Sequence, residues 1–357
     1  MDWSGRQRGV PGPGCSGCRV CAGCGASWTR SAHRSCSRVP TPMRMAVIGA
    51  GRMGTLHARR LARMPDVDLV GVADVNEARA RALAGELGCR SFGSHASLIV
   101  TGRPEGVVVA LPPSEQVTVG CDVLESGIAA LIEKPVAPDL EAAERLTSVC
   151  ASSGSLLVGG YVERFNPVFG TLSLWLREGL VGDPIVATTR RFGTNDRPAH
   201  SSDVLMDLAV HDVDLMHALF GQTVFASAAR PTRVLSDGVW AAADIALKLP
   251  EATVVCSAGW SARAPERTIA SRGPRGVLRA DLLTGLLRFR GRDGSERSKR
   301  VSTGDSLTAQ LEHFVRLAMG PIAARPPACE AVRALRTVCL ARGAALDPGR
   351  GQRNREA

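Results

Sequence analysis

The pattern of apolar and polar residues along the chain changes near residue 150. Before that point, short apolar runs alternate with segments whose apolar residues recur at helical spacing. Such alternation predicts strands and helices in turn, and therefore an α/β fold with a parallel, doubly wound sheet. The expected strands are MAVI (45–48), VDLVGVAD (67–74), GVVVALPP (106–113) and IAALIEKP (128–135).

Longer runs suited to strands dominate after residue 150. Three of them fall between 223 and 262 with few helical breaks, and further strands are expected over 266–290. Successive strands of this kind predict an open, mostly antiparallel sheet. Helical spacing returns in NPVFGTLSLWLREG, at about 203–220 and in two closing segments. The second half should therefore be an α+β domain, with SLLVGGYVERF as its first strand.

The two ends of the chain lack either pattern. Residues 1–42 are rich in Gly, Pro, Ser and Arg and contain CSGCRVCAGC, whose spacing is typical of metal or iron–sulfur sites. Almost no apolar residues accompany these cysteines, so we favour disorder, or a start codon assigned upstream of Met43, over a metal site. We expect folded domains at 43–150 and 151–345 and a flexible tail at 346–357.

The composition agrees with about two folded domains. The chain has 357 residues, 45% of them hydrophobic, and no run approaches the roughly 18 apolar residues that span a bilayer. No apolar segment follows the basic N-terminus, so we expect no secretory signal and a cytoplasmic location. The net charge is +10, but six arginines and Asp2 within residues 1–42 account for +5 of it. This distribution argues against nucleic acid and is compatible with an anionic small molecule as partner.

A GxGxxG motif, formed by Gly49, Gly51 and Gly54, follows the first expected strand. In a dinucleotide-binding domain, Gly49 permits the tight turn, Gly51 lets the backbone approach the pyrophosphate and Gly54 lets the helix pack on the sheet. Asp74, at the end of the next strand, is expected to bond the adenine ribose hydroxyls, which favours NAD over NADP. The expected cofactor contacts here are Gly49, Gly51, Arg52, Met53, Gly54 and Asp74.

Lys134 stands out because the chain otherwise uses arginine as its cation. Only Lys134, Lys248 and Lys299 are lysines among 44 basic residues. A desolvated lysine can release a proton near neutral pH, whereas arginine cannot. Lys134 follows a strand of the expected parallel sheet, at the edge where such sheets bind ligands, so we expect it beside the nicotinamide. The alternative is a strand-end lysine exposed at the surface.

The segment DLAVHDVDLM is expected to be a helix with Asp207 and His211 on one face and Asp214 nearby. Spacing alone leaves three interpretations open. The pair could ligate a metal. It could act in catalysis, with the imidazole as proton carrier and Asp207 as its orienting partner. The face could also simply be solvated.

VIGAGRMG, EKP, YVERFNP and DLAVHDVDLM, in this order, resemble the Gfo/Idh/MocA family of NAD(P)-dependent sugar and cyclitol oxidoreductases. The resemblance implies a Rossmann domain followed by an open-sheet domain, and a homodimer or homotetramer formed through that sheet. It also implies that Lys134, Asp207 and His211 are catalytic and that no metal takes part.

The chain departs from the family pattern in the segment LPPSEQ, where Leu111 and Gln116 replace the frequent Thr and His. A glutamine can still hydrogen-bond the cofactor but cannot titrate. His57, in the first helix, is interpreted as structural. The further cofactor contacts that the resemblance implies are Leu111, Pro112, Gln116, Glu133 and Lys134.

YVERFNP and DLAVHDVDLM are most similar to the UDP-N-acetylglucosamine 3-dehydrogenase branch. This implies oxidation of a secondary sugar hydroxyl, at C3 of a UDP-N-acetyl amino sugar. An inositol or free-sugar dehydrogenase is the alternative within the family, and a non-catalytic NAD-binding regulator is the alternative outside it. The implied substrate contacts are Arg164, Asn166, Arg191, Asp207 and His211, with Arg190 and Arg197 as further candidates for a phosphate. Solvent exposure is the alternative for these phosphate candidates, and an ion pair with Glu163 or another acid is the alternative for Arg164.

Overall fold

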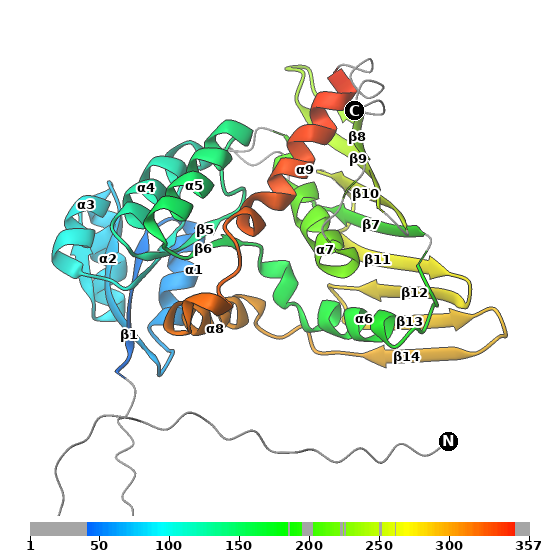
Figure 1. Ribbon diagram of the computed structural model, residues 1–357, viewed down its shortest axis with the longest axis horizontal. Coiled ribbons are helices and arrows are strands. Elements are labelled where there is room, and N and C mark those ends of the chain that lie inside the picture. The colour runs from blue at the N-terminus through cyan, green and yellow to red at the C-terminus, as the bar shows by residue number, and fades with distance from the viewer. Residues whose placement is uncertain are drawn as a thin grey trace, which may run out of the picture. The chain divides into compact units, whose positions relative to one another are not determined.

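The computed structural model describes residues 41–184, 186–194, 203–221, 224, 226–249, 252–260 and 262–346. The expectations for the N-terminal cysteines, for the C-terminal tail beyond residue 346 and for Arg197 lie outside these residues. The described chain contains two sheets (Figure 1). Within it, no helix has the length and apolar content needed to cross a membrane.

The first sheet has six parallel strands in the order β3-β2-β1-β4-β5-β6, which confirms the expected doubly wound arrangement. β6, which was expected to be the first strand of the second domain, pairs with β5 and therefore belongs to this sheet. The rest of SLLVGGYVERF is not strand, since Val162–Phe165 forms a 3-10 helix, η2. The strands are β1 (Met43–Ile48), β2 (Val67–Ala73), β3 (Arg90–Phe92), β4 (Gly106–Val109), β5 (Ala129–Glu133) and β6 (Leu157–Gly160).

Alternate residues of β1 face two different helix layers, because successive side chains of a strand point to opposite faces. Ala46 and Ile48 belong to the core shared with α4 and α5, whereas Met45 and Val47 pack in the core that contains Phe314 of α8. The closing helix α8 therefore returns from the second half of the chain to cover this sheet beside α1 (Figure 1). The helices are α1 (Arg52–Leu61), α2 (Glu77–Leu87), α3 (His95–Ser97), η1 (Leu98–Gly102), α4 (Pro113–Glu125), α5 (Leu140–Ser153) and α8 (Ser306–Met319).

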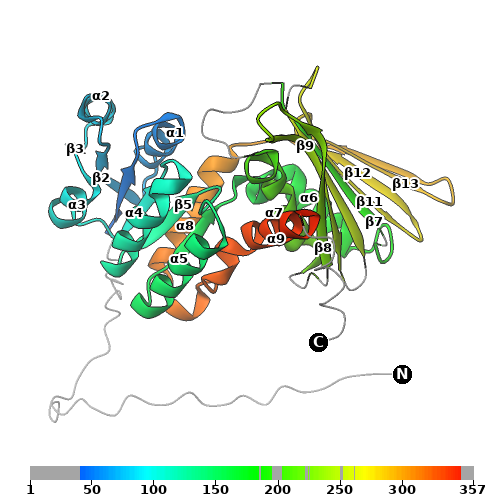
Figure 2. The ribbon, with the colours of Figure 1, turned by 90° about the horizontal axis from the view of Figure 1, so that it is seen from above.

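The second sheet has eight strands in the order β14-β13-β12-β11-β7-β10-β9-β8. Its neighbours are antiparallel except for β7 and β10, which confirms the expected mostly antiparallel sheet. α6 (Pro167–Arg177), α7 (Val210–Phe220) and α9 (Cys329–Leu346) all cover one face (Figure 2). The strands are β7 (Val186–Phe192), β8 (Ala226–Val234), β9 (Trp240–Lys248), β10 (Thr253–Gly259), β11 (Glu266–Gly273), β12 (Gly276–Asp281), β13 (Leu286–Gly291) and β14 (Glu296–Arg300).

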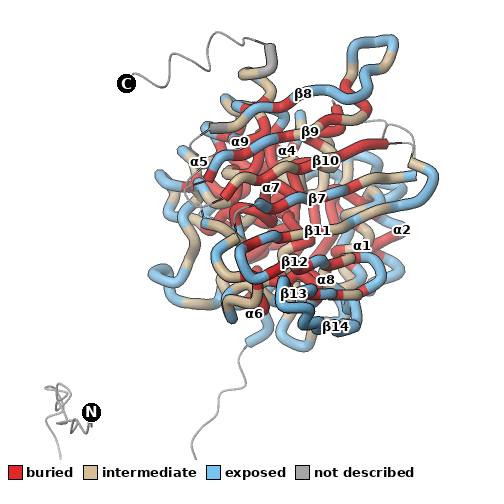
Figure 3. The backbone as a smooth tube through the Cα atoms, turned by 90° about the vertical axis from the view of Figure 1, so that its right-hand side faces the viewer, coloured by how far each residue is buried: buried red, intermediate tan, exposed pale blue. Residues whose placement is uncertain are grey.

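The other face of this sheet is open, as the alternation of buried and exposed residues along its strands indicates (Figure 3). On β7, for example, Ala187, Thr189 and Arg191 are buried under the helices, whereas Thr188 and Arg190 are exposed. The two arginines are neighbours in sequence but lie on opposite faces of the sheet.

The segment expected as one half-buried helix begins with a π-helical turn, η3 (Leu205–Ala209), and continues as α7. All residues from Val210 to His217 are buried, so this helix has no solvated polar face. The structure thereby excludes the solvated interpretation of DLAVHDVDLM. A buried charged group requires a partner, and the partners of these side chains define the site.

Candidate active site

The glycine loop connects β1 to α1 and has the geometry that the motif predicts. Gly49 has φ +98°, and a Cβ there would lie 2.3 Å from the carbonyl oxygen of Ala110. A Cβ at Gly54 would lie 1.7 Å from the carbonyl oxygen of Gly49, so the helix can pack this closely only without a side chain. A Cβ at Gly51 would meet nothing within 4 Å, which leaves space beside the backbone at the N-terminus of α1. This open cradle fits a bound pyrophosphate.

Asp74 directly follows β2 and lies against the glycine loop. Its Oδ2 accepts a hydrogen bond from the backbone N–H of Ala50, and its Oδ1 accepts one from the N–H of Asn76, both at 2.7 Å. The carboxylate is therefore fixed at the strand end where a ribose would be recognised. Arg52 and Met53 occupy the first turn of α1 in the same region.

Lys134 follows β5 and connects the two sheets. Its Nζ donates to the backbone oxygen of Asp207 at 2.9 Å and lies 3.1 Å from Oδ1 of the same residue. The lysine side chain is 22% exposed, so it lies at the rim of the site and not in bulk water. The EKP motif and the DLAVHDVDLM segment, separated by about 70 residues, therefore meet in one place.

Hydrogen bonds from buried side chains fix the backbone on both sides of Lys134. Glu133 Oε2 accepts a hydrogen bond from the Lys134 N–H, and Glu133 Oε1 lies 2.7 Å from Nε2 of His57. Gln116 donates to the carbonyl oxygens of Glu133 and Pro135. His57 and Gln116 are fully buried. These contacts support the structural interpretation of His57, and they give the amide of Gln116 a partner in the protein where a cofactor contact was expected.

Leu111 and Pro112 lie at the same edge of the first sheet as Lys134. They come after β4, and Pro112 caps the N-terminus of α4. Neither contributes a charged group, so their expected role toward a cofactor is one of shape.

Asp207 does not bond the imidazole of His211. Its Oδ2 instead accepts a hydrogen bond from the indole Nε1–H of Trp260, at 2.9 Å, while Oδ1 faces Lys134. The expected pairing in which Asp207 orients His211 is therefore not formed, since the carboxylate bonds Lys134 and Trp260 instead. Trp260 lies just beyond β10 and was not identified from the sequence.

His211 is 9% exposed, and its Nδ1 has no hydrogen-bond partner. Burial lowers the pKa of His211 well below its ordinary value. The positive charges of Lys134, Arg191 and Arg267 lower this pKa further. The unprotonated imidazole, which can accept a proton, is therefore the form present at neutral pH.

Arg191 forms a buried ion-pair network instead of a surface phosphate site. Its Nε donates to Asp212 at 2.8 Å and its Nη1 to Glu163 at 3.0 Å, and the side chain is 3% exposed. The role expected for Arg191 is corrected, because its face of β7 is covered by α7. Arg190, on the open face, pairs with Glu266 at 2.7 Å.

Arg164 and Asn166 also have structural partners. Arg164 makes a two-point ion pair with Asp214 and a further one with Glu330, so the ion-pair alternative describes it, with these acids in place of Glu163. Burial nevertheless raises the pKa of Asp214 to about 6. Asn166 caps α6 by accepting from the Val168 N–H, which uses the side chain expected to contact a sugar.

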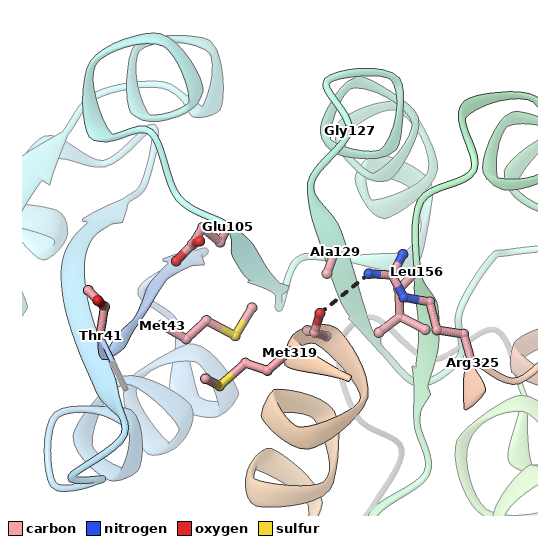
Figure 4. A pocket seen from close by; sticks show the side chains of 9 residues that line it. Thr41, Met43, Glu105, Gly127, Ala129, Leu156, Met319 and Arg325 are labelled. Carbon is pink, nitrogen blue, oxygen red and sulfur yellow. Dashed lines mark hydrogen bonds between the residues drawn. The ribbon is translucent and has the colours of Figure 1, made fainter. Parts of the chain in front are cut away.

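A cavity at the opposite edge of the first sheet is not part of this site. Its volume is about 130 Å³, and it lies at the amino ends of the strands, whereas Lys134 and Asp74 lie at their carboxyl ends (Figure 4). Arg325 spans its wall and donates to the carbonyl oxygen of Ala318. Among the described residues, no group of three or more His, Cys, Asp or Glu side chains is arranged to hold a metal ion.

Comparison with known proteins identifies the class of enzyme. Residues 43–161 match the Gfo/Idh/MocA oxidoreductase family with its NAD-binding Rossmann fold, and residues 170–279 match the Gfo/Idh/MocA C-terminal domain. The chain belongs to the Gfo/Idh/MocA oxidoreductases. It is an NAD-dependent dehydrogenase, which confirms the family, the Rossmann fold and the cofactor class expected from the sequence.

Individual relatives differ in how much of their length they share with the chain. UDP-N-acetylglucosamine 3-dehydrogenase of Acidithiobacillus ferrooxidans is 29% identical over 316 residues, which cover 84% of this chain and 95% of the relative. Inositol 2-dehydrogenase 4 of Saccharopolyspora erythraea is 31% identical over 195 residues, 54% of this chain and 58% of the relative. A solved structure of the Acidithiobacillus enzyme superposes with a TM-score of 0.75 at 27% identity, covering 85% of this chain and 98% of that one.

Proposed function

We propose that this enzyme oxidises a secondary hydroxyl of a sugar, at C3 of a UDP-N-acetyl amino sugar. One observation carries the proposal: Lys134, at the carboxyl edge of the dinucleotide sheet, is held on Asp207 one helical turn from His211. A lysine and a neutral imidazole are thus placed together where a substrate would lie between the two sheets. The similarity to UDP-N-acetylglucosamine 3-dehydrogenase along nearly its whole length supports the choice of sugar.

The glycine loop, Asp74 and the edge around Lys134 would hold the dinucleotide. When bound, NAD supplies the hydride acceptor. Gly51 leaves its backbone accessible to the pyrophosphate, and Asp74 presents a fixed carboxylate to the ribose. A carboxylate at that position disfavours the additional phosphate of NADP, because like charges repel.

His211 and Lys134 would remove the proton of the substrate hydroxyl. His211 takes this proton, directly or through Lys134, because its imidazole is unprotonated at neutral pH. The ammonium of Lys134 donates a hydrogen bond to the substrate oxygen and stabilises the negative charge that develops there. Asp207, fixed by Trp260, keeps the lysine in position.

Two other functions make different predictions. An inositol or free-sugar dehydrogenase is supported by relatives such as inositol 2-dehydrogenase 4, but those alignments cover little more than half of either chain. A non-catalytic NAD-binding regulator would not require Lys134, Asp207 and His211 to lie together.

The test is formation of NADH by the purified full chain with a panel of substrates. The panel contains UDP-N-acetylglucosamine, its uronate, free N-acetylglucosamine, myo-inositol and glucose. Turnover confined to the UDP-sugars is the expected result. Turnover of free polyols alone would replace the substrate with one of the inositol type, and bound NAD without any turnover would favour the regulator.

The open face of the second sheet is where the family resemblance places an interface between subunits. We propose a homodimer or homotetramer formed through this face. Light scattering of the purified chain tests it, because a monomeric mass at micromolar concentration would contradict the assembly.

A further inference from the structure

Arg267 lies on the helix-covered side of the second sheet but is not buried there. It pairs directly with Arg191 across the β11–β7 ladder, and Ile269 and Ser271 of the same face are buried. The side chain of Arg191 is 3% exposed, whereas that of Arg267 is 46% exposed. The guanidinium of Arg267 therefore emerges at the end of the strand, where the helices no longer cover the sheet.

One carboxylate fixes Arg267 in place. Oε1 of Glu163 accepts from Nη1 of Arg191 at 3.0 Å and from Nη1 of Arg267 at 2.9 Å. To the residues that the structure describes, Arg267 makes this single side-chain hydrogen bond. An arginine has five N–H donors, so most of those of Arg267 remain available to a ligand.

Arg267 is the exposed member of a charge-balanced cluster. Two guanidinium groups, Arg191 and Arg267, face two carboxylates, Glu163 and Asp212, and of these four side chains only that of Arg267 is largely open to solvent. Through Glu163 and Arg191, Arg267 is linked to Asp212, the residue that follows His211 in α7. Its positive charge also contributes to the lowering of the pKa of His211. An exposed, anchored guanidinium is thus connected by three ion pairs to the helix that holds the imidazole.

We propose that Arg267 recognises the diphosphate of the nucleotide sugar, an inference that rests on the proposed function. Arginine presents donors in a planar fork that matches phosphate oxygens at two points. In a UDP-sugar the diphosphate is attached at C1, which is separated by C2 alone from C3, whose hydroxyl His211 would deprotonate. The role that the sequence suggested for Arg190, Arg191 or Arg197 is thereby assigned to an arginine on the neighbouring strand.

The experiment compares Arg267→Ala and Arg267→Gln with Arg336→Ala in the full chain. Like Arg267, Arg336 of α9 is an exposed arginine that pairs with one carboxylate, that of Glu144, so it is a matched control for loss of charge. We measure kcat and KM for UDP-N-acetylglucosamine with NAD, and the affinity for UDP alone by calorimetry. Both Arg267 variants should raise KM and weaken UDP binding about 10- to 100-fold, as expected for hydrogen bonds to a charged group, while Arg336→Ala changes neither.

Values of KM and UDP affinity within twofold of wild type in Arg267→Gln would overturn the inference. The glutamine variant keeps a donor for Glu163, so a loss seen equally in both variants, with an unchanged thermal melting temperature, is not a folding defect. The wild-type chain reports separately on the proposed function. Wild type that binds UDP but oxidises only free polyols would overturn that function, while loss of UDP binding in Arg267→Gln would still support this site.

Discussion

The indole Nε1–H of Trp260 donates to Oδ2 of Asp207 at 2.9 Å and fixes a carboxylate whose other oxygen faces Lys134. Trp260 is 6% exposed, so the hydrogen bond is shielded from water. A tryptophan of the second sheet thereby sets the position of a lysine of the first. The arrangement of the three side chains links the two halves of the candidate active site.

Replacement of Trp260 by Phe should lower kcat without impairing NAD binding. The phenyl ring retains most of the packing but leaves Asp207 without one of its donors. Because a hydrogen bond to a charged group contributes about 1.5–3 kcal/mol, we expect kcat to fall about 10- to 100-fold. Steady-state kinetics and NAD titration check this, with Trp240→Phe as a control in the same sheet. An unchanged kcat would show that Asp207 does not need this support.

Lys134 should not be replaceable by arginine. Lys134→Ala is expected to lower kcat by about 10²–10⁴-fold, the usual contribution of acid–base assistance. Lys134→Arg keeps the charge but cannot transfer a proton near neutral pH, so it should remain similarly impaired. Lys248→Arg, on an exposed part of β9, serves as the control. A fully active Lys134→Arg enzyme would remove proton transfer from the role of this residue.

The glycines of the loop should fail in two different ways when they are replaced by alanine. A methyl group at Gly51 meets no protein atom within 4 Å, so Gly51→Ala should fold normally yet bind NAD at least about tenfold more weakly, by about 1.4 kcal/mol. A methyl group at Gly54 collides with the carbonyl oxygen of Gly49. Gly54→Ala should therefore lose about 1–3 kcal/mol of unfolding free energy. Chemical denaturation and NAD titration separate the two effects, and a destabilised Gly51→Ala protein would contradict this account.

Burial of His217 should make the free energy of unfolding decrease on acidification. Burial lowers the pKa of His217 from 6.5 to about 4, and its Nε2 lies 2.9 Å from Oγ1 of Thr337. Between these two pH values the unfolded chain binds more protons than the folded one, so stability is lost as the pH falls through this window. The loss amounts to as much as about 3 kcal/mol.

The measurement is the unfolding free energy of wild type and of His217→Gln at about pH 7 and about pH 4. The decrease in unfolding free energy from about pH 7 to about pH 4 should be smaller in the variant than in wild type, by up to about 3 kcal/mol. Comparison with wild type is needed because Asp214, whose pKa burial raises to about 6, shifts stability in the opposite direction. Equal pH dependence in the two proteins would contradict the prediction.

Local patterns could predict four strands of the first sheet, β1, β2, β4 and β5, together with the glycine loop and the position of Asp74 at a strand end. Gly49, Gly54 and Asp74 act through neighbours within one βαβ unit, so their spacing contains the necessary information. The partners of buried charges could not be predicted in this way. On β7, Thr188 and Arg190 alternate with Thr189 and Arg191, and nothing in this pattern tells which face the helices cover.

Long-range partners account for the other errors. Trp260 reaches Asp207 from 53 residues away, and Glu330 reaches Arg164 across 166 residues. The strand β6 was assigned to the wrong sheet because a short apolar run does not specify which strand it pairs with. Which face of a strand is buried depends on packing between segments that are distant in sequence. The same packing determines whether an arginine on that strand is paired in the interior or exposed to a ligand.

The most direct test of the proposed activity uses UDP-N-acetylglucosamine labelled with deuterium at C3. The full chain is incubated with this substrate and NAD, and the reduced nicotinamide is analysed by mass spectrometry. Deuterium in the reduced cofactor is the predicted result, since the hydride would come from C3. Unlabelled reduced cofactor, or oxidation of free polyols without any turnover of the UDP-sugar, would contradict the proposed reaction.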